Sequence, residues 1–440
     1  MSLALRTTCY RCANLFNFLK KTLFSKKFIE QHRTSPTAFT RNRKIPFHLL
    51  ICFIINFIKG SYQAELDRFF QVLTRSSMAK RAVSKAAFAK ARMKLKFEAF
   101  IELNQNLIDG FNTTFQYRTW QGLRLLAIDG TTLTLPKVSQ IIDHFGAWNG
   151  RQGDPCPKAR ASQLYDPLNK LTIKAIISPK STGERQQAKQ LLSDISPNSL
   201  ILLDRGYPAF WIFKLIFGQR VEFCARICSK WKIVRQFIRS GKKEKIIELK
   251  PSTTAIHSCK ELGLDLKPMN LRLIRVELDT GDIEILITSL LDRQTFPHDE
   301  FCELYHLRWP VEEDYKTMKC RMEIEAFTGQ SVLSVYQDFY ANVFAKNLVA
   351  VMMFPAQEAL NTSGIKKKYV HQVNFTQAIA VAKNLVALIF QRSHRRVRLL
   401  IQSFMEILVS TTEPVRPGRK YPRNHRANKK HYYQNYKQVC

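Results

Sequence analysis

The first 118 residues alternate apolar and polar positions with the period of amphipathic helices. One segment, YQAELDRFFQVL, covers residues 62–73, and a second covers residues 83–108. The second begins at Ser84, a residue type that often caps the N-terminus of a helix. The run IPFHLLICFIINFI at residues 45–58 is almost wholly apolar, which is typical of a buried helix. The pattern therefore predicts an N-terminal helical region.

The period changes near Gln121, where short apolar runs replace the helical spacing. Such runs, bounded by Gly, Pro, Asn and Asp, predict buried strands and turns. Three strands, a helix, a strand, a helix and a strand would form a mixed sheet covered by helices, so the expected fold class is α/β. In chain order these elements are a strand at 123–135, a hairpin at 159–179, a helix at 183–195, a strand at 199–207, a helix at 208–219 and a strand at 220–227.

The alternation of strands and helices stops after residue 228. Residues 229–290 contain three strand-like runs with polar turns between them, which predicts a β-rich insertion. Helical patterns return at residues 297–322 and again after about residue 340. The last residues form a basic tail with little apolar surface to bury. We expect five parts, with boundaries at 1–118, 119–228, 229–290, 291–340 and 341–440.

The chain is strongly basic: it has 69 Lys and Arg residues and 35 Asp and Glu residues, which gives a net charge of +34. Such an imbalance indicates a polyanionic partner, either nucleic acid or an anionic membrane surface. The most apolar run has 14 residues, and a membrane span needs about 20. The first residues show no secretory signal. We therefore expect an intracellular, cytoplasmic protein that binds nucleic acid through its basic helical N-terminal region, although a solvated basic helix also explains residues 83–108.

The ten cysteines follow no regular framework. Cys9 and Cys12 form a single C-x-x-C, and no second pair stands at the spacing of a zinc site. Reduced and mostly buried thiols are therefore expected.

Two carboxylates follow buried strands. Asp129 closes the run LLAID and Asp204 closes the run LILLD, each before a turn that contains Gly. Neighbouring strands would bring both side chains to one edge of the sheet, whereas either acid alone could be an ordinary turn residue. With a third carboxylate they could hold two Mg²⁺ ions, because Mg²⁺ prefers carboxylate oxygens and two ions about 3.5–4 Å apart serve phosphodiester chemistry.

Glu312 is the expected third acid, within YHLRWPVEEDYKTMK at residues 305–319. A helix that starts at Pro310 places Glu312 in its first turn and Lys319 on the same face. Residues before Pro310 share that face only if the helix continues through them, and a kink at Pro310 would aim them differently. A solvated helix with ion pairs is the alternative for such a charged segment.

The spacing Tyr305-x2-Arg308-x3-Glu312-x6-Lys319 resembles, without gaps, the Y-R-E-K signature of the bacterial insertion-sequence DDE transposases of family four. DGTTL at Asp129 and DRGY after residue 203 are similar to the first and second acidic motifs of that family. The resemblance covers roughly residues 30–340. It implies a ribonuclease-H-like core in two parts, interrupted by an inserted β domain, with a helical N-terminal and a helical C-terminal region.

The resemblance also implies roles for single residues. Asp129, Asp204 and Glu312 would be the catalytic triad and would hold two Mg²⁺ ions, for which Mn²⁺ could substitute. Tyr305, Arg308 and Lys319 would contact the backbone of the transposon end near the cleaved phosphate.

Two further residues have weaker grounds for a role in DNA binding. Trp231 could stack on a displaced base, as an aromatic residue of the insertion does in this family, or it could pack in a β-domain core. Arg205 could reach a phosphate, or it could form an ion pair with a neighbouring acid.

The function expected is cut-and-paste DNA transposition by metal-dependent cleavage and strand transfer. The partners would be double-stranded DNA, both terminal inverted repeats and target DNA, and a second copy of the chain in a synaptic complex, without a membrane. A bacterial, nucleoid-associated location would follow. The alternatives are a catalytically silent DNA-binding remnant, a nuclease of the same fold that cuts without joining and, more distantly, a protein of the membrane surface.

Overall fold

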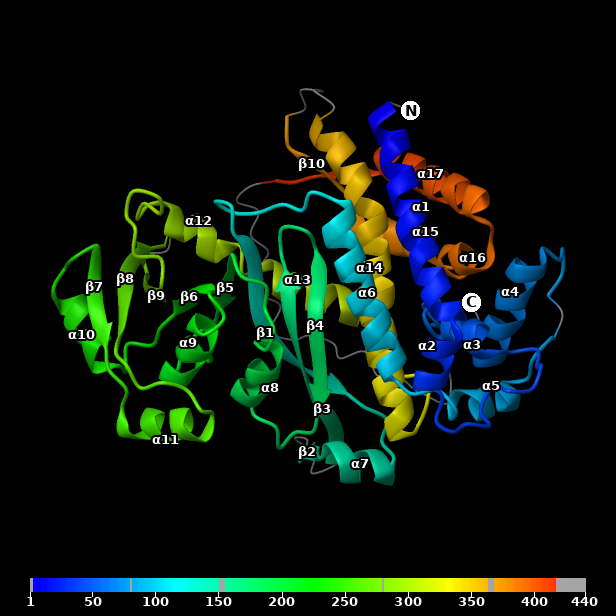
Figure 1. The fold of residues 1–440 in the computed structure, drawn as a ribbon, viewed down its shortest axis with the longest axis horizontal. Coiled ribbons are helices and arrows are strands. Elements are labelled where there is room, and N and C mark those ends of the chain that lie inside the picture. Colours follow the sequence, from blue (N-terminus) through cyan, green and yellow to red (C-terminus); the bar gives the residue numbers. More distant parts are fainter. Residues whose placement is uncertain (1–2, 80, 150–154, 279–280, 363–367, 417–440) are drawn as a thin grey trace. The chain divides into compact units, whose positions relative to one another are not determined.

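The computed structural model describes residues 3–79, 81–149, 155–278, 281–362 and 368–416, and Figure 1 shows its ribbon. The chain forms two compact units. The first contains Met1–Gln116, Thr134–Pro157 and Lys316–Cys440, and the second contains Tyr117–Leu133 and Lys158–Tyr315. The predicted basic tail after residue 416 lies outside the described residues. The division into five parts stays a prediction.

Nine strands form one mixed sheet within the described residues, and all but β2 lie wholly or mainly in the second unit. The sheet has the order β2-β3-β1-β5-β6-β9-β8-β7, and β4 pairs with β3. β1, β5 and β6 are parallel neighbours, whereas β3 and β4 form an antiparallel hairpin. The predicted mixed α/β architecture is confirmed. The bounds are β1 Arg124–Thr134, β2 Ala147–Asn149, β3 Pro155–Asp166, β4 Leu171–Ser178, β5 Ser199–Leu203, β6 Glu222–Arg226, β7 Glu244–Leu249, β8 Met269–Glu277 and β9 Ile283–Thr288.

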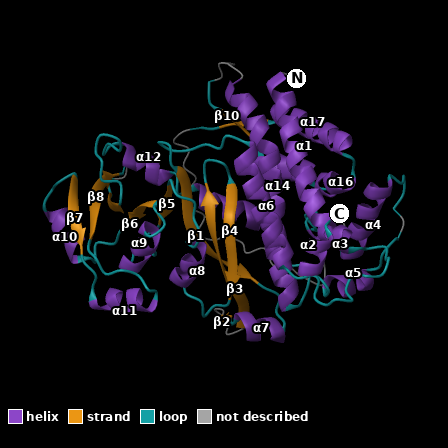
Figure 2. Cartoon of the chain, viewed as in Figure 1, coloured by secondary structure: helices purple, strands orange, loops and turns teal. Residues whose placement is uncertain are grey.

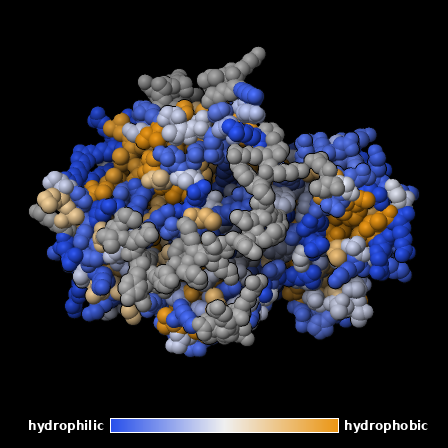
Figure 3. Space-filling view, turned by 180° about the vertical axis from the view of Figure 1, so that it is seen from behind, coloured by the Kyte–Doolittle hydropathy of each residue, from blue (hydrophilic) through white to orange (hydrophobic). Residues whose placement is uncertain are grey.

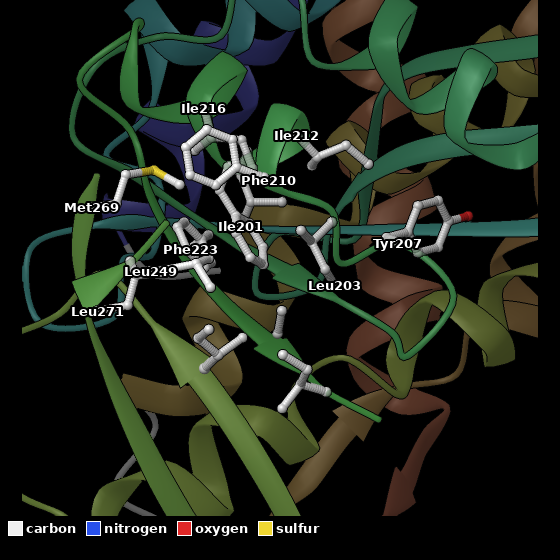
Figure 4. Packing of buried hydrophobic residues seen from close by; sticks show 14 of the residues in the cluster. Ile201, Leu203, Tyr207, Phe210, Ile212, Ile216, Phe223, Leu249, Met269 and Leu271 are labelled. Carbon is white, nitrogen blue, oxygen red and sulfur yellow. The ribbon is translucent and has the colours of Figure 1, made fainter. Parts of the chain in front are cut away.

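The core of the second unit surrounds the parallel strands. Every residue of β5 is buried, which is typical of a strand covered on both faces. Figure 4 shows Ile201 and Leu203 of this strand packed among side chains of helix α9 and strand β8. Loss of such a side chain, for example by Leu203→Ala, would cost about 2–5 kcal/mol of stability. This packing fixes the position at which β5 ends.

The three strand-like runs of residues 229–290 are indeed strands β7, β8 and β9. They continue the large sheet, because β9 pairs with β6 and β8 with both β9 and β7. Helices α10 and α11 lie in the same segment and were not expected. Helices outside the first unit are α8 Glu184–Leu191, α9 Phe210–Phe217, α10 Lys232–Arg239, α11 Thr253–Glu261 and α12 Glu300–His306, while α13 Pro310–Lys316 ends at the boundary between the units.

The first unit is mainly helical, as Figure 2 shows. Its longest helix, α14, packs against α1, α6 and α17. α14 is long and apolar enough to cross a membrane, but 89% of its apolar window is buried inside the protein, as in a central core helix. The helices are α1 Leu3–Phe24, α2 Lys26–His32, α3 Phe47–Ile54, α4 Tyr62–Thr74, α5 Lys85–Arg92, α6 Glu98–Thr114, α7 Ser139–Phe145, α14 Val332–Thr362, α15 Phe375–Ala382, α16 Leu385–Gln391 and α17 His394–Ser410, with a small pair of strands, β10 His371–Val373 and β11 Thr412–Pro414.

The helical predictions for the N-terminal region hold, with one correction. α3 is buried and α4 is amphipathic, as expected. Ser84 caps α5, because its hydroxyl accepts a hydrogen bond from the backbone N–H of Ala87. The segment 83–108 is not one helix, since it breaks between α5 and α6, where the backbone of Leu95 pairs with Arg33. Tertiary pairing has replaced helical continuity at this point.

The described cysteines are all free. Cys9 and Cys12 are buried in α1, and burial raises the pKa of the Cys9 thiol to about 11. Burial also raises the pKa of the Cys12 thiol well above its ordinary value. Reduced thiols are the prediction, and these two groups pack as small apolar side chains in α1.

Candidate active site

Asp129 and Asp204 lie side by side because of the register of two parallel strands. Ile128 of β1 pairs with Leu203 of β5. Asp129 directly follows Ile128 in the chain, and Asp204 directly follows Leu203. Both side chains are partly exposed, at 21% and 33%. The prediction that neighbouring strands bring them to one place is confirmed.

The environment of Asp129 differs from the predicted one. β1 runs on to Thr134, so Asp129 lies within the strand and the expected Asp-Gly turn is absent. A Cβ at Gly130 would lie 3.1 Å from the Ser162 hydroxyl and 3.6 Å from the Tyr207 hydroxyl. A side chain here would be in tight contact with Ser162, so close packing favours glycine. The turn predicted after Asp204 does form, closed by the hydrogen bond from the Tyr207 N–H to the Asp204 carbonyl at 3.0 Å.

The two carboxylates have opposite electrostatic environments. Burial raises the pKa of Asp129 to about 6, and the charges of Glu312 and Asp204 add to this effect, while the Gly130 N–H and Arg308 oppose it. Burial also acts on Asp204, but the Arg205 backbone N–H and the Arg226 guanidinium outweigh it and hold the pKa of Asp204 below its usual value. At Asp129 the Gly130 N–H and Arg308 do not outweigh burial, whereas at Asp204 the surrounding donors do.

Arg226 is a site residue that the sequence pattern did not reveal. It ends β6, beside the end of β5, and its guanidinium donates to Asp204 Oδ1 at 2.9 Å and to Glu284 Oε1 at 2.5 Å. Glu284 lies on β9, the next strand of the sheet. Arg226 is the last residue of β6, as Asp204 directly follows β5, and this position at a strand end is the signal that could have identified it.

The segment that carries Glu312 is interrupted at Pro310. α12 ends at His306 and α13 begins at Pro310, which is its first residue, as predicted. Proline has no N–H to continue the ladder of the preceding helix, so of the two arrangements left open the interrupted one is observed. Between the helices, backbone hydrogen bonds span three residues, as from the Arg308 N–H to the Tyr305 carbonyl at 3.1 Å.

Arg308 is the central cation of the site. It is buried, with 4% exposure. Its Nη2 lies 2.7 Å from Glu312 Oε1 and its Nη1 lies 4.0 Å from Asp129 Oδ2. The guanidinium thereby links the acid of α13 to the acid of β1.

Tyr305 reaches the second carboxylate. Its hydroxyl donates to the Leu203 carbonyl and to Asp204 Oδ1, both at 3.4 Å, and its ring lies 5.9 Å from the Arg308 guanidinium. Tyr305 is buried, and burial together with the charge of Asp204 raises the pKa of its hydroxyl, so the hydroxyl stays protonated.

Tyr207 and Tyr315 lie next to Asp129 and Gly130 of strand β1. The Tyr315 hydroxyl donates to the Asp129 carbonyl at 3.0 Å. Figure 4 shows the Tyr207 hydroxyl pointing away from the apolar cluster, and it is buried without a hydrogen-bond partner in the described part of the chain. Neither tyrosine has a periodic signal in the sequence.

Lys319 cannot be placed on the face of Glu312 by helical period. It lies in a π-helical segment, Thr317–Arg321, in which the Met322 N–H bonds to the Thr317 carbonyl five residues earlier. A common face assumes 3.6 residues per turn, which no longer holds after Lys316. Lys319 also belongs to the first unit. Its role stays a prediction.

The other two predicted DNA contacts, Trp231 and Arg205, lie in a core-packed position and in an exposed turn, respectively. Trp231 precedes α10 and packs, half-buried, against the core cluster of the second unit. Arg205 is exposed in the turn after Asp204. Within the described residues the ion-pair partner of Asp204 is Arg226. The role of Arg205 in DNA binding stays a prediction.

The chain is similar to known proteins over most of its length. Residues 120–348, just over half of the chain, match the family described as transposase DDE domain. The chain belongs to this family. It is 23% identical over 420 residues to the transposase InsG for insertion sequence element IS4 of Escherichia coli K12, which covers 93% of this chain and 91% of that protein. It also resembles a solved piggyBac transposase synaptic complex with hairpin DNA, at a TM-score of 0.45 and 10% identity, over 90% of this chain and 82% of that one.

The predicted family, function and enzyme class are thereby confirmed: the protein is a DNA transposase of the DDE type. Transposases of this family generally use divalent metal ions. Among the residues that the structure describes, no three His, Cys, Asp or Glu side chains form a group ready to hold one ion. In this structure Glu312 is engaged by Arg308 at 2.7 Å.

The residues of this transposase nevertheless fit a hard divalent cation. All three acids offer oxygen donors, which Mg²⁺ and Mn²⁺ prefer. Burial raises the pKa of Asp129 to about 6, and the nearby charges of Glu312 and Asp204 act in the same direction, so the ionised carboxylates repel one another. A bound cation would reduce that repulsion.

Proposed function

We propose that this transposase cuts double-stranded DNA at the two ends of an insertion sequence and joins the freed 3′ ends to target DNA. The observation that supports the proposal most is the position of Asp129 beside Asp204, with Glu312 linked to Asp129 through Arg308. Three acids and a guanidinium are then available at one phosphodiester.

The proposed metal ligands are Asp129, Asp204 and Glu312. When bound, two Mg²⁺ ions would supply Lewis-acid stabilisation of the phosphodiester and an activated water; Mn²⁺ could replace them. The chain's own part is to hold the three carboxylates on rigid elements. Arg226 keeps Asp204 ionised, and the Gly130 N–H, 2.9 Å from Asp129 Oδ1, orients the carboxylate of Asp129. Positioning of this kind supplies much of the rate of phosphoryl transfer.

Arg308 has a second proposed role at the DNA backbone. Its guanidinium can pair with either a carboxylate or a phosphate, since both accept two parallel N–H bonds. We expect Arg308 to exchange Glu312 for a phosphate oxygen when DNA binds, which frees Glu312 for the metal. Tyr305 and Lys319 would hold neighbouring phosphates, and Arg205 and Trp231 are proposed as further DNA contacts.

The wider arrangement is also part of the proposal. The strand order β4-β3-β1-β5-β6, with β1, β5 and β6 parallel, supports a ribonuclease-H-like core. Residues 1–118 would bind the terminal repeats, two copies of the chain would hold two ends together, and the protein would act in the bacterial cytoplasm at the nucleoid. The net charge of +34 supports a polyanionic partner.

A strand-transfer assay with the Glu312→Gln variant tests the proposal. The protein is incubated with Mg²⁺ and a labelled DNA end, and products are separated by size. We expect cleavage and joining by the parent chain and neither by Glu312→Gln, while DNA binding is retained. Glu313→Gln, which removes the charge of the exposed neighbouring acid, is the matched control and should behave as the parent.

The products also separate the alternatives. Cleavage without joined product would indicate a nuclease, and DNA binding without cleavage would indicate a silent remnant. Full cleavage by Glu312→Gln would remove Glu312 from the mechanism.

A further inference from the structure

The first unit has a large groove far along the chain from the three acids. One wall is formed by residues between 37 and 46, and the other by residues between 82 and 94, which include helix α5. Its volume is about 1020 Å³. We call it the basic groove, because its lining includes five cations, Arg41, Arg43, Lys44, Lys90 and Lys94, and none of its described lining residues is acidic.

These five cations are available to a ligand. All five are exposed. Within the described residues none of them takes part in an ion pair, whereas Arg92 on the same helix pairs with Asp338 at 2.5 Å. Five cations of one sign, held close together without counter-charges, repel one another in the absence of a polyanion.

The two walls of the groove are fixed to each other. The Thr34 N–H donates to the Lys94 carbonyl at 3.0 Å, and the Lys96 N–H donates to the His32 carbonyl at 2.8 Å. On the loop side, the rings of Phe39 and Phe47 pack edge to face, with centroids 5.3 Å apart. The groove is therefore a built feature of the N-terminal region.

Helix α5 is itself anchored from its buried side. The Arg92 guanidinium donates to Gln337, Thr328, Asp338 and the Ser334 carbonyl, four groups of the segment around the start of α14. α5 also packs against α3 and α4, beside which Figure 1 shows it. Lys90 thus projects from a helix whose position is set by a buried network, and Lys94 follows the end of that helix.

The surface of the groove leaves room for the backbone of an anionic polymer to approach helix α5 closely. The apolar lining residues on α5 are Ala86, Ala87 and Ala91, whose side chains are small. The N-terminal end of the helix adds partial positive charge, which favours an anion.

We infer that the basic groove binds the sugar–phosphate backbone of double-stranded DNA outside the region of cleavage, an inference that rests on the proposed function. Duplex DNA carries one negative charge per about 1.7 Å of its axis, so a short length of it presents several phosphates to the five cations. The groove holds the transposon end or the adjacent DNA while the carboxylates act on the cleaved bond.

The lining favours duplex DNA over single strands. Single-stranded nucleic acid is bound by aromatic rings on which bases stack. The aromatic ring that lines the groove, Phe39, is only partly exposed and is packed against Phe47. A phosphate-binding surface without a free stacking platform matches the regular backbone of a duplex.

The test is the salt dependence of DNA binding by the full chain. A labelled 30-bp duplex of random sequence is titrated at several NaCl concentrations with the parent and with the Lys90→Ala/Lys94→Ala variant. Each phosphate contact adds about 0.9 to the slope of log K against log salt. We expect the double variant to bind on the order of tenfold more weakly at each sequence tested and to lose about 2 from the slope.

A matched control removes the same charge elsewhere in the same unit. Arg395 and Arg398 are exposed arginines of helix α17, outside both the groove and the proposed repeat-binding region, and Arg395→Ala/Arg398→Ala should keep the slope of the parent. Equal slopes for the parent and the groove variant, or equal losses in groove variant and control, would overturn the inference. So would tighter binding to vesicles rich in anionic lipid than to the duplex.

Failure of this inference differs from failure of the proposed function. If the parent cleaves DNA with Mg²⁺ but the groove variant keeps the parent's slope, the groove is not a DNA site and the proposed function stands. If the parent neither binds nor cleaves DNA, the proposed function itself fails.

Discussion

The carboxylate site of the second unit and the basic groove of the first handle charge in opposite ways. At the carboxylate site each acid has a partner or a defined environment: Asp204 pairs with Arg226, Glu312 with Arg308, and Asp129 receives the Gly130 N–H. In the basic groove the cations are exposed and have no ion pair within the described part of the chain.

The difference corresponds to the two proposed functions of these sites, catalysis and DNA binding. Chemistry on a phosphodiester requires groups fixed in place before the substrate arrives, so paired and half-buried charges are suitable. Binding to a polyanion gains from the release of counterions, so exposed and unpaired cations are suitable. Figure 3 shows a mainly hydrophilic coloured surface with smaller hydrophobic patches, as expected for a chain of this charge.

The largest effect is expected from loss of a carboxylate beside the parallel strands. Asp204→Asn keeps the size of the side chain and removes its charge, so metal-dependent cleavage should fall at least about 10³-fold. Duplex binding should stay within about twofold of the parent, since the groove is untouched. Asp194→Asn, at an exposed turn between α8 and β5, is the control for the change of residue type. Cleavage by Asp204→Asn at the parent's rate would break the distinction between the two sites.

Two basic residues of α5 differ in their partners, because Arg92 forms a buried ion pair and Lys90 forms none within the described residues. Replacing each in turn tests how much each one contributes to stability. Arg92→Ala would leave Asp338 buried without its partner, which should lower the free energy of unfolding by about 3–5 kcal/mol. Lys90→Ala, two residues away and exposed, should change it by less than about 0.5 kcal/mol. Urea unfolding of the two variants measures both values. Similar losses would mean that the anchoring of α5 does not depend on the Arg92 network.

The pKa of Asp129 predicts a dependence of stability on pH in the absence of metal. Because burial raises this pKa to about 6 in the folded chain, folding takes up a proton between pH 4 and 6, and stability falls as pH rises through that range. Asp129→Asn should therefore be more stable than the parent at pH 7, by on the order of 2 kcal/mol, with little difference below pH 4.

Thermal unfolding in a chelator at several pH values checks this prediction. Asp143→Asn, on the exposed side of α7, should not alter the profile. A parent whose stability rises from pH 4 to 7 as much as that of Asp129→Asn would contradict the environment assigned to Asp129.

A smaller effect is expected from Arg226, which positions Asp204. Without its guanidinium, burial would raise the pKa of Asp204, so the acid limb of the cleavage profile in Arg226→Gln should move to higher pH. The rate at neutral pH should fall by about tenfold. Arg239→Gln, on exposed α10, is the control. An unchanged pH profile with a lower rate would assign Arg226 a purely structural role.

Much of the fold was predictable because its signals are local. The strands β5 and β6 are short apolar runs, the β3–β4 hairpin has turn residues, and Ser84 caps α5. The proposed role of Glu312 rests on the spacing of four residue types, and it stays a prediction. These features depend on a few neighbouring residues, so a sequence displays them.

The rest depends on contacts between distant residues. The dipeptide Asp129-Gly130 has the composition of a turn, yet Gly130 lies within strand β1, where Ser162 of β3 approaches it closely. Arg226 acquires its role only when β9 brings Glu284 beside it. The π-helical segment that changes the direction of Lys319 has no signal in the spacing of apolar residues. Each feature arises from packing across the sheet or between helices.

The most direct measurement compares two variants in two assays: Glu312→Gln and Lys90→Ala/Lys94→Ala, each in duplex binding and in Mg²⁺-dependent cleavage at saturating DNA. We expect Glu312→Gln to bind as the parent does and not to cleave. The groove variant should bind more weakly, with a smaller salt slope, and cleave at the parent's rate once saturated. Loss of both properties in either variant, or cleavage by Glu312→Gln, would contradict the separation of chemistry from binding.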